Sequence, residues 1–78
     1  MADFTAKQGQ YLAFIHLYTK INRQPPAVAD IAAYFRVSPP SAQNMVTTLV
    51  RKGLAEKTPR AARSLRVLIP VEDIPALD

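Results

Sequence analysis

The chain has 78 residues, 49% of them hydrophobic, no cysteine and a formal net charge of +4. This length and apolar fraction fit one small domain with a hydrophobic core and argue against a disordered chain, while the lack of cysteine excludes a disulfide framework and a thiolate metal site. No apolar run approaches the roughly 20 residues of a membrane span, and the N-terminus lacks the basic and then apolar order of a signal peptide, so we expect a cytoplasmic location.

The first predicted element is a helix that starts after Thr5 and runs to about residue 21. Thr5 and Gln8 have the spacing of a capping box, in which each side chain bonds to the backbone N–H of the other residue. We expect Ala13 and Leu17 to lie on the side of this helix away from the core. The side chains expected in the core recur at helical spacing: Tyr11, Leu12, Phe14, Ile15, Tyr18 and Ile21.

A second helix is predicted at about residues 27–35, after Pro25 and Pro26 have ended the first. Only Arg36 and Val37 separate this helix from Ser38, so it must meet the next helix at a steep angle. Two helices joined by so short a turn form the helix-turn-helix pattern, in which the second helix of the pair enters a DNA groove.

The third predicted helix, residues 38–52, has an apolar face and an uncharged polar face. Ser38 is a good N-cap, and Pro39 follows where a missing N–H costs nothing. The apolar face consists of Ala42, Met45, Val46 and Leu49. Amide and hydroxyl groups suit the reading of base edges in the major groove, although the same groups could merely solvate a surface helix. The candidate base-reading residues are Ser41, Gln43, Asn44 and Thr47.

A β-hairpin is predicted after Gly53, which fits the left-handed position at a helix end. Its strands are residues 54–58 and 64–69, and Leu65, Val67 and Ile69 alternate toward one face. The five-residue loop 59–63 between the strands has two arginines and no acid. Because this loop has no apolar residue large enough to anchor it, its arginines are expected to contribute little to stability. Residues 70–78 form an acidic, proline-containing tail, expected to be extended or loosely packed beside a domain of residues 1–69.

Basic residues are concentrated in the middle of the chain. Residues 36–66 hold seven Lys or Arg and one Glu, a net charge of +6, whereas residues 67–78 have a net charge of −3. Such a field suits nucleic acid, although basic surfaces also occur without such a partner. The residues expected to hold DNA phosphates are Ser38, Arg51, Lys52, Arg60, Arg63 and Arg66.

Three helices followed by a basic-tipped hairpin predict an α+β, mainly α, winged helix-turn-helix fold. An ordered set of residues carries a resemblance over roughly residues 4–69: Phe4-Thr5-Ala6-Lys7-Gln8, Phe14-Ile15, Tyr18, Pro25-Pro26, Asp30-Ile31-Ala32, Ser38-Pro39, Leu49, Lys52-Gly53-Leu54 and Arg63-Ser64-Leu65-Arg66-Val67. With this set the chain resembles the N-terminal DNA-binding domain of LexA-type repressors and, more distantly, MarR-type regulators. The resemblance implies a repressor-like regulator that binds double-stranded DNA sequence-specifically, with helix 38–52 in the major groove and wing 59–63 on the backbone or in the minor groove.

The chain departs from the family pattern in two ways. Ala27 stands where the family usually has Ser or Thr, so half of the capping box formed with Asp30 is missing. LexA-type repressors also carry a C-terminal protease and dimerisation domain that cuts an Ala-Gly bond. In these 78 residues the glycines follow Gln8 and Lys52, so self-cleavage is not carried over.

No enzymatic activity, metal or cofactor is expected. His16 is the only histidine and is expected at the solvated surface, and neither a carboxylate pair nor a glycine-rich phosphate loop is present in the sequence. Because one recognition helix gives limited specificity, we hypothesise a weak homodimer through Leu17, Ile74 and Leu77. The alternative function is a winged-helix module for protein–protein contact within a larger assembly, without specific DNA binding.

Overall fold

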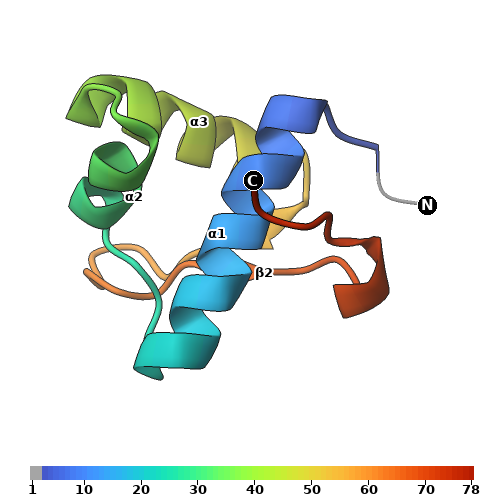
Figure 1. Ribbon diagram of the computed structural model, residues 1–78. Helices are drawn as coiled ribbons and strands as arrows, with labels where there is room; N and C mark the ends of the chain where they lie inside the picture. Colours follow the sequence, from blue (N-terminus) through green and yellow to red (C-terminus); the bar gives the residue numbers. More distant parts are fainter. Residues whose placement is uncertain (1–2) are drawn as a thin grey trace.

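The computed structural model describes residues 3–78 and has a mainly helical α+β fold (Figure 1). Its elements in chain order are α1 (Ala6–Asn22), α2 (Val28–Phe35), α3 (Pro39–Arg51), β1 (Ala55–Glu56), β2 (Arg66–Val67) and the 3₁₀ helix η1 (Val71–Asp73). This order confirms the predicted winged helix, three helices followed by a two-stranded antiparallel hairpin.

The helices start at the predicted caps. Thr5 Oγ1 accepts the Gln8 N–H at 3.1 Å, and Gln8 Oε1 accepts the Thr5 N–H at 3.0 Å, which completes the capping box of α1. Ser38 Oγ accepts the backbone N–H of Ser41 at 3.2 Å at the start of α3. At the start of α2, Ala27 makes no side-chain cap, but its N–H donates to Asp30 Oδ2 at 2.8 Å. The predicted half capping box is therefore present.

The core lies where α1 meets the α2–α3 pair and the hairpin. Two aromatic rings of α2 stack on two rings of α1. The centroids of Phe35 and Tyr11 are 4.1 Å apart, and those of Tyr34 and Phe14 are 4.6 Å apart. The buried apolar cluster consists of Tyr11, Leu12, Phe14, Ile15, Ile31, Ala32, Ala42, Val46, Leu49, Leu54, Ala55 and Leu65. This cluster fixes the position of α3, whose apolar face it covers.

Two predictions for α1 are wrong. Ile21 is 75% exposed, because the burial of α1 ends at Ile15 and the last turn of the helix extends past the core. Ala13 is fully buried instead of lying on a free side, and Leu17 is half-buried. Ala13 lies one turn after Gly9, which is in close contact with Pro75 of the C-terminal tail. The tail thus covers a side of α1 that helical periodicity alone assigns to solvent.

The C-terminal tail is fastened to the helices rather than loosely packed. After η1 it returns to α1 (Figure 1), where the Gln10 side chain donates to Ala76 O at 2.9 Å and accepts the Asp78 N–H at 2.8 Å. The Tyr34 hydroxyl of α2 donates to Asp78 O at 2.9 Å, and Leu77 packs against the core. The sequence gives no local sign of these contacts, because their partners lie 44 to 68 residues away.

The hairpin strands are shorter than predicted. Ala55 lies opposite Val67 and Glu56 opposite Arg66. The ladder stops after Glu56 because the Ser64 hydroxyl accepts the Thr58 N–H at 2.9 Å and donates to backbone carbonyls of the loop, taking up groups that a longer ladder would pair. Gly53 has the predicted left-handed conformation, with φ 77°.

Candidate nucleic-acid interface

The polar face of α3 points away from the core, as the sequence predicts. Ser41, Asn44 and Thr47 are exposed, whereas Ala42 and Val46 on the opposite face are buried. Gln43, the fourth candidate reader, is half-buried. The helix therefore presents hydroxyl and amide groups to solvent along its outer side.

The candidate readers differ in how free their polar groups are. The Gln43 side chain donates to Thr47 Oγ1 at 3.4 Å, and Ser38 Oγ donates to Ser41 Oγ at 3.0 Å. Among residues 3–78 the Asn44 side chain has no hydrogen-bond partner. Asn44 can donate and accept without breaking an internal bond, which is what a bidentate contact to a base edge requires.

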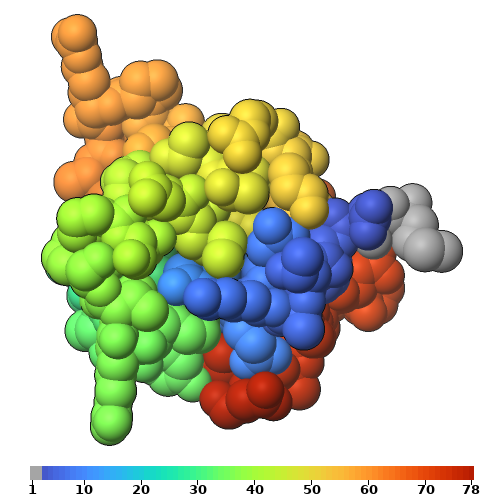
Figure 2. All heavy atoms as spheres, turned by 90° about the horizontal axis from the view of Figure 1, so that it is seen from above, coloured from blue at the N-terminus to red at the C-terminus, as the bar shows by residue number. Residues whose placement is uncertain are grey.

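The hairpin loop and the acidic tail lie on opposite sides of the molecule. In Figure 2 the loop (orange) projects beside α3 (yellow-green), and the tail (red) lies across the helices from the loop, at the bottom and right of the view. The exposed cations in or near α3 in the sequence are Arg36, Arg51, Lys52, Lys57 and Arg60. The basic loop and the acidic tail, which are separated along the chain, are therefore also separated in space.

Four of the six expected phosphate-holding residues make internal contacts. Lys52 Nζ donates to Gln8 Oε1 at 2.8 Å, and Arg66 Nη2 pairs with Glu56 Oε2 at 2.6 Å across the hairpin. Arg63 Nη1 pairs with Asp30 Oδ2 at 2.9 Å. Ser38 Oγ bonds to Ser41, whereas the exposed Arg51 and Arg60 side chains make no hydrogen bond within residues 3–78. The basic segment is thus divided into cations open to solvent and cations held by the protein itself.

The loop 59–63 is anchored, contrary to the prediction from its lack of apolar residues. Arg63 supplies the anchor, because its Nη1 donates to Asp30 Oδ2, to the Tyr18 hydroxyl at 3.3 Å and to Pro25 O at 3.2 Å. Sequence reasoning missed the roles of Asp30 and Tyr18. The capping pattern at Asp30 was visible, but a partner 33 residues away was not.

Electrostatics within this anchor favour the charged forms of both partners. The Ala27 N–H donated to the Asp30 carboxylate lowers the pKa of Asp30, Arg63 lowers it further, and partial burial opposes both effects. Hydrogen bonding to Tyr18 and to Asp30 raises the pKa of Arg63. The pair is ionised at neutral pH.

The remaining expectations concern metal, membrane and His16. Residues 3–78 contain no group of three or more His, Cys, Asp or Glu placed to hold a metal ion. In the same part of the chain no helix has the length and apolar character needed to cross a bilayer. His16 is half-buried rather than fully solvated and lies on a shallow hollow between α1 and the hairpin, beside Lys20 and Leu65.

A capped helix with a polar outer face, preceded by a second helix across a short turn and flanked by a basic-tipped hairpin, defines a winged helix-turn-helix DNA-binding domain. Comparison with known families gives the particular one. The family described as LexA DNA binding domain matches residues 1–64. The chain belongs to the LexA DNA-binding domain family.

Proteins similar to this chain are called LexA repressor. The one from Thermotoga neapolitana is 38% identical over 73 residues, which cover 94% of this chain and 37% of the relative. Those from Thermosipho melanesiensis and Ralstonia nicotianae are 34% and 40% identical, over 92% and 86% of this chain. The chain spans only 32% to 40% of the length of these three relatives.

Proposed function

We propose that this domain binds double-stranded DNA sequence-specifically as the DNA-binding part of a transcriptional repressor. The observation that carries the proposal is the outer face of α3, where Ser41, Asn44 and Thr47 are exposed opposite a buried apolar face. The loop that contains the exposed Arg60 lies beside this helix. The repressor role comes from the names of the longer relatives.

The proposed complex places α3 in the major groove, with Ser41, Gln43, Asn44 and Thr47 on base edges. The wing 59–63 then lies on the backbone or in the minor groove. Phosphate contacts fix the register without specifying sequence. Arg51 and Arg60 are proposed to hold phosphates with free side chains. Ser38, Lys52 and Arg66 are proposed for the same role, but their hydrogen bonds to Ser41, Gln8 and Glu56 have to break first.

Salt dependence tests the proposal. Fluorescence anisotropy of a labelled random duplex is measured with the 78-residue chain between ~50 and ~200 mM salt. Log affinity should fall linearly with log salt, with a slope of about −0.9 for each phosphate neutralised. Selection of bound duplexes from a random library should then enrich one motif. A chain that binds no duplex at low salt contradicts the proposal and favours a protein-interaction module.

We propose further that two copies pair on a near-palindromic site, because one recognition helix has limited specificity. Of the three residues suggested for a dimer, Leu77 packs against the core of its own domain, and Leu17 and Ile74 are half-buried. This leaves little free apolar area, so the pairing that we propose is weak and is promoted by DNA.

A further inference from the structure

We infer that Arg63 is a positioning residue, which holds the wing against α1 and α2 so that Arg60 reaches a DNA phosphate, and which makes no phosphate contact itself. This inference rests on the proposed DNA binding. It assigns different roles to two arginines of one five-residue loop, which the sequence alone treats as equivalent.

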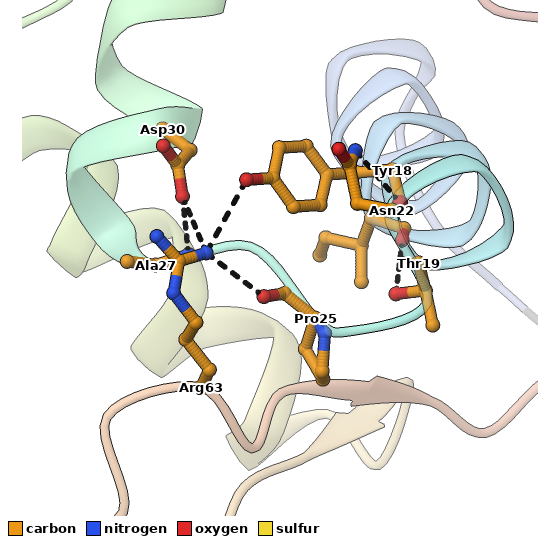
Figure 3. Close-up of polar contacts among 8 residues, drawn as sticks. Tyr18, Thr19, Asn22, Pro25, Ala27, Asp30 and Arg63 are labelled. Atoms are coloured by element: carbon orange, nitrogen blue, oxygen red, sulfur yellow. Dashed lines mark hydrogen bonds and ion pairs between the residues drawn. The ribbon is translucent and has the colours of Figure 1, made fainter.

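The contacts of Arg63 join three separate parts of the molecule (Figure 3). Its Nη1 lies 2.9 Å from Asp30 Oδ2 on α2, 3.3 Å from the Tyr18 hydroxyl on α1, and 3.2 Å from Pro25 O in the connection between these helices. One guanidinium nitrogen therefore fixes the end of the wing loop relative to both helices.

Asp30 connects this anchor to the helix-turn-helix. The same oxygen, Oδ2, accepts the Ala27 N–H at 2.8 Å and so caps the start of α2. A displacement of Arg63 would take a donor away from the capping oxygen. An exposed ion pair adds little to global stability, but here the two charges have a fixed geometry because the cap already holds the carboxylate.

The rest of the loop, within residues 3–78, makes no hydrogen bond to a helix. Ser64 closes the loop on itself, through the Thr58 N–H at 2.9 Å and Ala61 O at 3.1 Å. Within residues 3–78, Arg63 makes the only hydrogen bonds that join residues 57–64 to the helices. Apart from the strands that it joins, the loop is thus hydrogen-bonded to the helices at one point, and its placement against α1 and α2 depends on that point.

Arg60 has the opposite character. It is exposed, has the left-handed backbone conformation with φ 66°, and has no acidic partner among residues 3–78. The charge of Arg63 is compensated by Asp30, whereas that of Arg60 is not. A phosphate contact through the other N–H groups of Arg63 is the competing role, and the two roles predict different responses to salt.

The experiment compares Arg63→Ala, Asp30→Asn and Arg60→Ala by anisotropy on one duplex over a range of salt concentrations. Arg60→Ala should flatten the salt slope by about 0.9, the loss of one phosphate contact. Arg63→Ala should weaken binding about tenfold and leave the slope unchanged, since the loosened wing has to be ordered on binding while Arg60 still contacts its phosphate in the complex. Arg63→Ala combined with Asp30→Asn should bind no worse than Arg63→Ala alone, because both act on one contact.

Asp30→Asn decides between the roles by the direction of its effect. Asn keeps an oxygen for the Ala27 N–H, so the cap of α2 is retained. If Arg63 positions the wing, this variant weakens binding about threefold, because a hydrogen bond to a neutral amide is weaker than one to a carboxylate. If Arg63 contacts phosphate, the loss of a competing negative charge leaves binding unchanged or strengthens it, and Arg63→Ala flattens the slope. Either result overturns the inference.

A measurement without DNA separates this inference from the proposed function. In the free chain, NMR order parameters of the Ala61 and Ala62 amides should fall from about 0.85 toward 0.6 in Arg63→Ala, while those of α3 stay constant. Arg60→Ala is the matched control and should leave them unchanged. An unchanged wing in Arg63→Ala contradicts the positioning role even if DNA binds. A loosened wing in a chain that binds no DNA contradicts only the proposed function.

Discussion

At the scale of single residues, Asn44 and Gln43 differ in how free their amide groups are. Asn44 is exposed and has no partner among residues 3–78, whereas Gln43 is half-buried and donates to Thr47. We expect Asn44→Ala to cost ~1–3 kcal/mol at the selected site and to leave binding to random DNA unchanged. We expect a smaller loss from Gln43→Ala, because part of its hydrogen bonding is already used within the helix.

Anisotropy on the selected and the random duplex measures both losses. Gln24→Ala is the matched control, since Gln24 is an exposed glutamine in the connection between α1 and α2. Equal losses on both duplexes would show that Asn44 positions the helix and does not read bases.

Asp30 makes the unfolding free energy depend on pH. The pKa of its carboxyl in the folded chain lies below its ordinary value of 3.8, chiefly because of the Ala27 N–H. Its stabilising effect is therefore fully present above pH 3.8 and is lost as the pH falls through the folded-state pKa. Urea unfolding at neutral and at acidic pH should show a smaller decrease in stability for Asp30→Asn than for the wild type. The same decrease in both proteins would contradict the assignment.

At the scale of elements, the two arginines of the wing are expected to act unequally. If both held phosphates, the double change of Arg60 and Arg63 to Ala would flatten the salt slope by roughly two units. With Arg63 held by Asp30, we expect about one unit, together with a weakening that is the same for all sequences. If the salt slope flattened by about two units, Arg63 would also contact a phosphate. If the slope did not change, neither arginine of the wing would contact one.

The helices could be predicted from the sequence because their determinants are local. Thr5 and Ser38 act as caps three residues from their partners, and Pro25 and Pro26 end a pattern within the same stretch of chain. The polar face of α3 followed from the same local periodicity. The ends of the strands did not, because they depend on where the Ser64 hydroxyl bonds.

Long-range contacts account for the other differences. Ala13 is buried on a helix that the C-terminal tail covers, and this tail lies more than 60 residues away in the sequence. The placement of Arg63 depends on Asp30 and Tyr18. A sequence pattern contains both partners of such a contact but does not pair them. The exposure of the polar face of α3 could thus be predicted, whereas the division of the cations into free and held ones could not.

At the scale of the whole molecule, the fastened tail limits how two copies can meet. Leu77 is taken up by the core and Leu17 is half-buried, so we expect a monomer in sedimentation velocity at micromolar concentration without DNA. On a palindromic duplex we expect two copies to bind. Leu17→Asp should weaken the cooperativity of this binding if Leu17 lies at the contact, and Leu17→Ala controls for loss of size alone. A free dimer would contradict the expectation, and unchanged cooperativity in Leu17→Asp would remove Leu17 from the contact.

The capping residues of α1 and α2 each accept two hydrogen bonds through one side-chain oxygen. Gln8 Oε1 accepts both the Thr5 N–H and Lys52 Nζ, just as Asp30 Oδ2 accepts both the Ala27 N–H and Arg63. One oxygen atom therefore links each helix start to a cation of the basic segment, residues 36–66. The amides of Thr5 and Ala27 then become reporters in deuterium exchange, because local opening exposes them to solvent. If Lys52 leaves Gln8 for a phosphate when DNA binds, the exchange rate of the Thr5 amide should change. If Arg63 stays on Asp30, the exchange rate of the Ala27 amide should be the same with DNA as in the free chain.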